Sequence, residues 1–271
     1  DGSQNTAVGY GALNADCVAD NTALGKSALN AYTGSNATAV GSGAADVAVG
    51  NANLTAIGKS ALGAATSGDY NTAVGAYCLD ATIDGANNTA VGSHSLSADC
   101  VSDNVAVGKY ALYAFTGSNA TSIGSGAADA ATSAGYLTAV GYNALGVLTD
   151  GTGNTAVGYS VLASQLTTGD YNTAVGMAAG QDVYGDQNTI IGRYAGLYAS
   201  SVNHCVAIGS SALQGWVSLP VTCTVTNTDA TVTCSSTDRI DVGHYLTGTG
   251  VPAGTTVASI NAGTGGASVT S

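Results

Sequence analysis

Two tripeptides in the sequence look like the end of a phosphate-binding loop. Residues 25–27 and 58–60 both read Gly-Lys-Ser. In such a loop another glycine stands about five residues before the Gly-Lys pair, because the loop backbone must wrap the phosphates. Asp20 and Asn53 occupy those two positions here. We therefore interpret both tripeptides as corners of a repeated unit and predict no cofactor.

Histidines and carboxylates are the next candidates for chemistry. The histidines are scattered and lack partners at ligand spacing: His94, His204 and His244. Three aspartates lie in polar connectors, where they are read either as Ca²⁺ ligands or, with greater weight, as solvated turn residues: Asp69, Asp170 and Asp186. We predict no catalytic residue, no cofactor-binding residue and no metal site, and a protein that is not an enzyme.

The six cysteines show no CxxC spacing, which argues against a zinc or redox site. Cys17 and Cys100 occupy the same slot five repeats apart, or about 24 Å at ~4.8 Å per strand. A disulfide requires Cα atoms within about 7 Å. Cys223 and Cys234 face each other in a predicted hairpin, where they form either a cross-strand disulfide or two reduced thiols on a buried face.

These residues are carried by one repeated unit, Asn-Thr-Ala-Val-Gly-x-x-Ala-Leu, which we call a rung. It returns at a short and nearly constant interval up to Leu213, and such a period predicts a solenoid. The glycine of each rung predicts a tight corner. The thirteen corner glycines are Gly9, Gly25, Gly41, Gly58, Gly75, Gly92, Gly108, Gly124, Gly141, Gly158, Gly176, Gly192 and Gly209.

Within a rung, Thr-Ala-Val predicts a short β-strand whose alanine and valine point to opposite faces. A strand that is apolar on both faces is covered on both faces. The coil covers one face, and a second copy of the chain is the simplest cover for the other. We expect Ala-Leu to begin a second short strand or a filler, giving a narrow coil with two strands per rung. Asparagines such as Asn71 and Asn88 are expected to hydrogen-bond to one another and to loop backbone.

Two larger features organise the chain. Segments 15–18 and 33–38 recur as segments 98–101 and 116–121, which indicates duplication of a five-rung block. After Leu213 the repeat stops, and we predict two domains: a rod at 1–215 and a small β-strand module at 216–271, which we expect to be truncated. The module contains the hairpin at 222–234 and a predicted strand, Gly-Pro turn and strand at 242–260.

The composition excludes several classes of partner. Charged residues make up 8% of the chain and the net charge is −12, with five basic residues. Nucleic-acid binding and attachment to anionic membranes are therefore disfavoured. No apolar run is long enough to span a bilayer, so we expect no membrane insertion. So little charge predicts a surface largely buried against other copies. The chain begins at Asp1 without Met, and we expect it to be a piece of a longer polypeptide.

The rung resembles the head repeats of trimeric autotransporter adhesins (YadA-like heads) over residues 1–213. This resemblance implies an all-β fold, a left-handed parallel β-roll of about 13 rungs, and a homotrimer. The present rung is a few residues longer, so connectors are expected to bulge outward. The same rung occurs in tail fibres and other virion proteins of bacteriophages, and residues 247–257 look like a short β module common in phage structural proteins.

The resemblance implies a structural or adhesive trimeric fibre on a phage virion, for host attachment or as a rigid spacer. Its partners would be its own copies, other virion proteins and a host surface receptor or glycan. A bacterial surface adhesin is the alternative. Two further hypotheses are an ice or crystal binder, from threonine in the second position of eleven rungs, and a polysaccharide-degrading tailspike, which needs a carboxylate pair. Tyrosines after the corner glycine either line a sugar-binding surface or, with more weight, cap the roll or its subunit interface.

Overall fold

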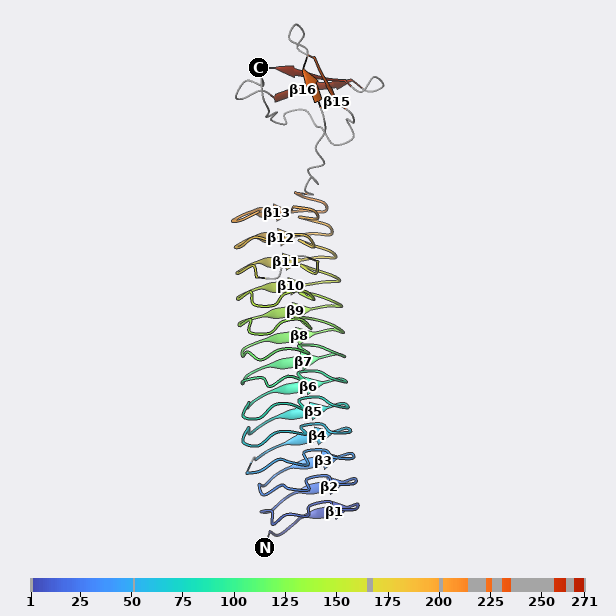
Figure 1. Ribbon diagram of the computed structural model, residues 1–271, viewed down its shortest axis with the longest axis vertical. Coiled ribbons are helices and arrows are strands. Elements are labelled where there is room, and N and C mark those ends of the chain that lie inside the picture. The colour runs from blue at the N-terminus through green and yellow to red at the C-terminus, as the bar shows by residue number, and fades with distance from the viewer. Residues whose placement is uncertain are drawn as a thin grey trace. The chain divides into compact units, whose positions relative to one another are not determined.

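The computed structural model describes residues 2–50, 52–164, 168–199 and 202–213, and the backbone of four further strands between 223 and 270. The chain divides into two compact units, residues 1–215 and 216–271. The first unit contains thirteen strands of three residues each (Figure 1). They are β1 (Thr6–Val8), β2 (Thr22–Leu24), β3 (Thr38–Val40), β4 (Thr55–Ile57), β5 (Thr72–Val74), β6 (Thr89–Val91), β7 (Val105–Val107), β8 (Thr121–Ile123), β9 (Thr138–Val140), β10 (Thr155–Val157), β11 (Thr173–Val175), β12 (Thr189–Ile191) and β13 (Val206–Ile208).

These strands form one parallel sheet in sequence order, each paired with the next. The register places equivalent positions side by side: Thr6 pairs with Thr22 and Ala7 with Ala23. Successive turns of the coil therefore stack like the rungs of a ladder, which Figure 1 shows along the unit. The predicted all-β parallel solenoid is confirmed for the part of the chain that the structure describes, where no helix occurs. The left-handed coil and the trimer stay predictions.

The corner glycines adopt a backbone that other residues avoid. Their φ angles run from +124° to +141°. A Cβ atom added to Gly25 would lie 2.4 Å from the carbonyl oxygen of Gly41, and one added to Gly108 would lie 2.5 Å from that of Gly124. Both the φ angle and the close approach of the next rung exclude a side chain here. Each of these glycines directly follows a strand, where the sequence predicts a tight corner.

The Ala-Leu pair forms a turn, so the expectation of two short strands per rung is wrong for the described rungs. Leu29 and Leu62 have φ angles of +52° and +54°, in the left-handed region. Their amides still bond to the next rung, Leu29 N–H to the Ala44 carbonyl at 2.9 Å and Leu62 N–H to that of Cys78 at 3.0 Å. The left-handed leucine reverses the chain sharply and keeps its side chain inside, so the pair fills the core as a turn.

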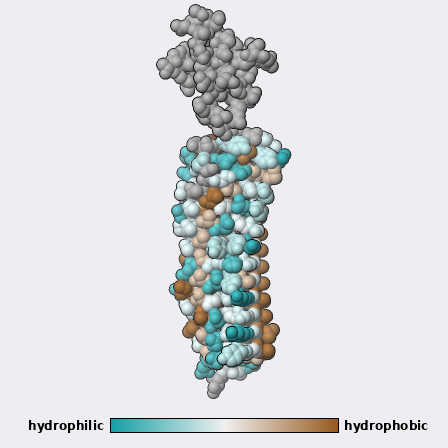
Figure 2. All heavy atoms as spheres, turned by 45° about the vertical axis from the view of Figure 1, so that its right-hand side comes forward, coloured by the Kyte–Doolittle hydropathy of each residue, from teal (hydrophilic) through white to brown (hydrophobic). Residues whose placement is uncertain are grey.

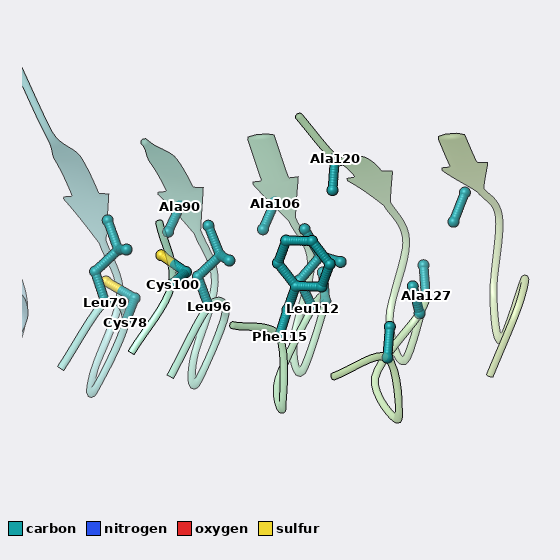
Figure 3. Packing of buried hydrophobic residues seen from close by; sticks show 14 of the residues in the cluster. Cys78, Leu79, Ala90, Leu96, Cys100, Ala106, Leu112, Phe115, Ala120 and Ala127 are labelled. Carbon is teal, nitrogen blue, oxygen red and sulfur yellow. The ribbon is translucent and has the colours of Figure 1, made fainter. Parts of the chain in front are cut away.

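The core is a continuous stack of small and aliphatic side chains. Away from the terminal rungs, strand alanines and turn leucines are fully buried, as Ala90 and Leu96 show in Figure 3. Tyr32 and Phe115, the two largest buried side chains, lie five rungs apart and so occupy the same slot of the duplicated block. Because strand alanines leave little width inside the coil, a large residue fits only where its neighbours are small.

One rung shows this compensation directly. Ile190 replaces the strand alanine in β12 and is fully buried. Gly180 and Gly196 stand at the turn positions that leucine holds in most rungs. A Cβ on Gly180 would approach Ile190 Cδ1 to 3.0 Å, and one on Gly196 would approach it to 3.1 Å. Ile190 therefore fills the volume that the two glycines leave.

Asparagines at the start of the rung join neighbouring turns. The Asn71 Oδ1 accepts a hydrogen bond from the Asn88 N–H at 2.9 Å, and the Asn88 Oδ1 accepts one from the Asn104 N–H at 3.0 Å. The side-chain amide of Asn88 donates to the Val101 carbonyl at 2.8 Å. Each buried asparagine thus satisfies the backbone of the next rung and of a connector, as predicted.

The second unit contains a four-stranded antiparallel sheet in the order β14-β15-β17-β16. Its strands are β14 (Cys223–Val225), β15 (Thr231–Cys234), β16 (Thr256–Asn261) and β17 (Gly266–Thr270). The backbone of Cys223 lies opposite that of Cys234, the register expected from the sequence. The disulfide between them stays a prediction. The strand and turn predicted at 242–255, and His244 within them, lie outside the described residues.

Candidate interaction surface

The outward face of the thirteen-stranded sheet carries two parallel columns of side chains. Because side chains alternate along a strand, the buried alanine is flanked on the outer face by the first and third residues. The first column is threonine in all strands except β7 and β13, which have valine. The third residue is always aliphatic, and we call this column the aliphatic strip: Val8, Leu24, Val40, Ile57, Val74, Val91, Val107, Ile123, Val140, Val157, Val175, Ile191 and Ile208.

The aliphatic strip is accessible to solvent in the single chain. Ile57, Val91 and Ile123, in the middle of the rod, are 39%, 36% and 42% exposed. No charged residue occurs in either column. Figure 2 shows hydrophobic residues in a regular row along one side of the unit. A single exposed valine needs no explanation, but an unbroken row of thirteen aliphatic residues is an apolar patch of the kind that marks an interaction site.

The strip can bind but has no groups for acid–base or nucleophilic chemistry. Burying the exposed part of one aliphatic side chain contributes on the order of 1 kcal/mol. Thirteen such contacts in register would contribute roughly 10 kcal/mol, comparable with the ~4–15 kcal/mol cost of association. A partner must therefore match the strip along most of its length. One threonine column and one aliphatic column also make the face unlike the two-threonine array that the ice-binding hypothesis requires.

The Gly-Lys-Ser tripeptides are rung corners, as their spacing predicts. Gly25 and Gly58 have φ angles of +139° and +137°, and Ser27 and Ser60 adopt left-handed conformations next to them. The Ser27 N–H donates to the Tyr10 carbonyl of the preceding rung at 2.8 Å, so it belongs to the ladder of rungs.

The connector aspartates are bound to backbone. The Asp69 Oδ1 accepts from the Ala52 N–H at 2.8 Å, and the Asp170 Oδ1 accepts from the Thr152 N–H at 2.7 Å. The Asp186 Oδ1 accepts from the Asp170 N–H at 2.9 Å. These carboxylates link successive turns, which favours the structural interpretation over a Ca²⁺ site. Among the described residues no group of three or more His, Cys, Asp or Glu side chains could hold a metal ion.

A shallow hollow of about 210 Å³ brings together Asp84 and Asp99, which belong to adjacent rungs. Sequence reasoning missed this carboxylate pair, although its spacing of nearly one rung could have pointed to it. The Asp84 Oδ1 accepts from the Ser67 hydroxyl, and the Asp99 Oδ1 accepts from the Ile83 N–H at 2.8 Å. Both carboxylates thus have partners within the roll, and the pair alone does not make a glycosidase site.

The structure assembles one cluster that the sequence did not reveal. Tyr77, His94 and Tyr110 occupy the same position of three successive rungs, and Tyr113 joins them from the connector. Ring centroids are 5.2 Å apart for Tyr77 and His94, 5.5 Å for His94 and Tyr110, and 5.4 Å for Tyr110 and Tyr113. We call these four residues the aromatic strip. Aligning the rungs at their corner glycines would have shown Tyr, His and Tyr in one column.

Two lysines flank the aromatic strip. Lys59 Nζ lies 5.0 Å from the ring centre of Tyr77, and Lys109 Nζ lies 4.7 Å from that of Tyr110. Both distances suit cation–π contacts, which hold each ammonium group near the strip. His94 also contacts a neighbour through Nδ1, which lies 2.9 Å from the Ser93 hydroxyl. The strip therefore combines aromatic rings, hydrogen-bonding groups and positive charge.

The carboxyl group of Asp80 adjoins this strip. Burial raises the pKa of Asp80, while a hydrogen bond from Ser97 and the charge of His94 lower it in part. The Asp80 Oδ1 is buried and has no hydrogen-bond partner among the described residues. Burial has the larger effect, so the net shift of this pKa is upward.

The described cysteines of the first unit are two buried residues, Cys78 and Cys100, and two half-buried ones, Cys17 and Cys205. Cys17, Cys78, Cys100 and Cys205 are free, in accord with the distance argument for Cys17 and Cys100. Burial raises the pKa of Cys78 to about 12. A thiol with so high a pKa is inert toward electrophiles at neutral pH, because the thiolate is the nucleophile.

The part of the chain that the structure describes contains no helix that is long and apolar enough to cross a bilayer. Comparison with known families, curated proteins and solved structures found no match for the chain.

Proposed function

We propose that this chain is a non-enzymatic structural and adhesive protein: the rod of a homotrimeric fibre or appendage on a bacteriophage virion, serving host attachment or acting as a rigid spacer. The observation that carries the proposal is the unbroken aliphatic strip along the outer face of the sheet. The resemblance of the rung to adhesin heads and phage fibres supports the same assembly and favours the virion surface.

A second copy of the same chain is the occupant that best fits the strip. Its own strip has the same rung spacing, so aliphatic residues meet along the full length when two rods lie in register. The net charge of −12 opposes contact elsewhere, whereas the two outer columns carry no charge. One strip per copy can also face a common axis, which allows three parallel rods to bury their strips together.

The proposed interface is tested by placing charge within the strip. Ile57→Lys, Val91→Lys and Ile123→Lys together put three ammonium groups at positions that are exposed in the single chain. These substitutions should leave the fold intact and abolish association, because a buried unpaired charge is costly. Native mass spectrometry should give three times the 26.1 kDa chain mass for the unaltered protein and a monomer for the variant.

A matched control is provided by exposed valines in the connectors. Val18→Lys and Val101→Lys alter residues that are each 55% exposed and lie outside the strip. The control variant should remain trimeric. A monomeric unaltered protein, or loss of the trimer in the control alone, would refute the proposed interface.

The virion location needs a separate test. Antibody against the rod, detected by immunogold electron microscopy, should label fibres on purified phage particles. Label on the bacterial surface with bare particles would instead support the adhesin alternative. No release of reducing sugar from host polysaccharide is expected, since the two carboxylates that share the hollow, Asp84 and Asp99, both accept hydrogen bonds from within the roll.

A further inference from the structure

We propose that the aromatic strip, with Lys59 and Lys109, is a binding site for an acidic oligosaccharide. This inference deepens the proposed function and rests on it in one respect: the aromatic strip must stay outside the contact between copies. The ligand of this site is a polyhydroxylated chain bearing carboxylate groups.

The duplicated block shows that the fold does not require three of the four residues of the aromatic strip: His94, Tyr110 and Tyr113. A shift of 83 residues, the length of five rungs, aligns the second block with the first and places Lys109 on Lys26. The core pair that follows is the same in both blocks, Ala28-Leu29 and Ala111-Leu112. The aromatic residues of the second block have small counterparts in the first: His94 aligns with Gly11, Tyr110 with Ser27 and Tyr113 with Asn30. Since the first block forms the same rungs without these rings, the rings are dispensable for the roll.

The arrangement of the rings fits an extended ligand. The strip advances by one ring per rung, with centroids 5.2 and 5.5 Å apart, a repeat of the same order as one pyranose unit. Tyr110 and Tyr113 are 38% and 45% exposed, so they offer apolar ring surface to a sugar ring. Phenol hydroxyls and an imidazole can hydrogen-bond to sugar hydroxyls, and tyrosine combines both kinds of contact at low entropic cost.

The charge of the ligand follows from the lysines. Lys59 and Lys109 are two of only five basic residues in a chain of net charge −12, and both lie beside the aromatic strip. The carboxyl group of Asp80 adjoins the strip, but its Oδ1 is buried. Two exposed ammonium groups therefore favour carboxylates on the ligand, and their contacts with tyrosine rings hold them in position.

The test uses the full chain and an array of uronic-acid and sialic-acid oligosaccharides. Each acidic glycan is printed beside its neutral counterpart, in which the carboxyl groups have been reduced to alcohols. We expect the unaltered chain to bind acidic members and to bind their neutral counterparts at least tenfold more weakly. Binding should weaken as salt concentration rises, since two ammonium groups contribute.

The key variant gives the second block the surface of the first. His94→Gly, Tyr110→Ser and Tyr113→Asn each introduce the residue found at the aligned position of the first block, so folding should be preserved. Binding should fall at least tenfold. Lys59→Ala with Lys109→Ala should remove the preference for acidic over neutral members.

Two control variants remove the same kinds of side chain, a stacked tyrosine pair and a lysine, at positions outside the aromatic strip. Tyr142→Ala with Tyr159→Ala removes another stacked pair, 5.4 Å apart, and Lys26→Ala removes the aligned lysine. Both should bind within about twofold of the unaltered chain. The proposal is overturned if no acidic member is bound, if the neutral members bind equally well, or if the surface-exchange variant binds normally.

Native mass spectrometry of every variant separates this proposal from the trimer. If the surface exchange dissociates the copies, the aromatic strip is part of their interface and the glycan site is refuted. A monomeric unaltered chain that still binds acidic glycans through the strip would refute the trimer alone.

Discussion

The two copies of the duplicated block share their rung framework and differ mostly at accessible positions, with two buried exceptions, the pairs 32/115 and 39/122. Corner glycines, turn leucines and rung asparagines are identical in residues 15–46 and 98–129. Within these two segments the aligned pairs that differ are 19/102, 22/105, 24/107, 27/110, 30/113, 32/115, 39/122 and 40/123. The corner glycines and rung asparagines, which contact the equivalent residues of adjacent rungs, are unchanged, whereas one outward turn position holds Ser in one copy and Tyr in the other.

The largest effect should come from the corner that both copies share. Gly25→Ala and Gly108→Ala each place a Cβ against the next rung and force a disfavoured φ angle. Each should destabilise the rod by about 3 kcal/mol or more, equally in the two blocks. Thermal unfolding followed by circular dichroism measures the loss.

The control for the corner lies two positions further on. Gly43 and Gly126 have φ angles of +67° and +66°, in the ordinary left-handed region, and other rungs place Ser or Tyr at this position. Their replacement by Ala should cost only about 1 kcal/mol. Equal losses at both kinds of glycine would contradict the special role of the corner.

The aligned cysteines should differ in reactivity. Cys100 is buried and its pKa is raised by that burial, whereas Cys17 is half-buried. Alkylation at mildly alkaline pH should therefore modify Cys17 at least tenfold faster than Cys100, because only the accessible thiolate reacts. Mass spectrometry of peptides from a time course gives both rates from one sample. Equal rates would mean that the two blocks open equally often.

A subtler difference separates the aligned aromatic residues of the core. The Tyr32 hydroxyl donates to the Ser35 carbonyl at 2.9 Å, and Phe115 has no such group. Tyr32→Phe should cost about 1 kcal/mol, the usual net value of one hydrogen bond. Phe115→Tyr should be tolerated within a similar margin, since Ser118 aligns with Ser35. Unfolding curves of the two variants give the change in the free energy of unfolding for each. A decrease above about 3 kcal/mol for Phe115→Tyr would show that the two slots differ in shape.

The smallest expected effect is a change of stability with pH, and it should be equal in the two blocks. Burial raises the pKa of both Asp46 and Asp129, which are aligned in the duplication. A carboxyl whose pKa is higher in the folded state binds more protons there. Its contribution to stability therefore grows as pH falls from neutral through the folded pKa toward the usual value of 3.8.

Melting temperatures measured from neutral to mildly acidic pH should thus rise on acidification. The double variant Asp46→Asn with Asp129→Asn should show a smaller increase in melting temperature on acidification. The increase that remains comes from other carboxyl groups and from the reduced net charge. Asp150 acts in the opposite sense, because hydroxyls of Ser133 and Thr132 lower its pKa. An unchanged slope in the double variant would show that other groups dominate.

Sequence reasoning reached the parts of this molecule that are set by the repeat itself. Strand, corner glycine, parallel stacking and asparagine ladder each follow from one residue type at a fixed position. The turn at Ala-Leu was missed because leucine rarely adopts a positive φ angle, so no local signal distinguishes it from a strand. The packing requirement of the narrow coil, which fixes Leu29 inside, overrides that preference.

The aromatic strip was missed for a different reason. Tyr77, His94 and Tyr110 are separated in the sequence by whole rungs, so their contact appears only when the rungs are aligned. The aliphatic strip was accessible to sequence reasoning, because its valines alternate with buried alanines along the strands. The sequence of one chain predicts that this face is apolar, but it does not identify the partner that covers the face.

The in-register stacking of the rungs also makes length a free variable. Each rung presents to its successor the same corner, the same asparagine and the same pair of columns that it received from its predecessor. Inserting whole rungs therefore extends the rod without creating a new kind of junction. The five-rung duplication is one such increment, worth about 24 Å at ~4.8 Å per rung. Whole rungs can therefore be added or removed during evolution, so that the length of the rod changes while the stability of each rung stays the same.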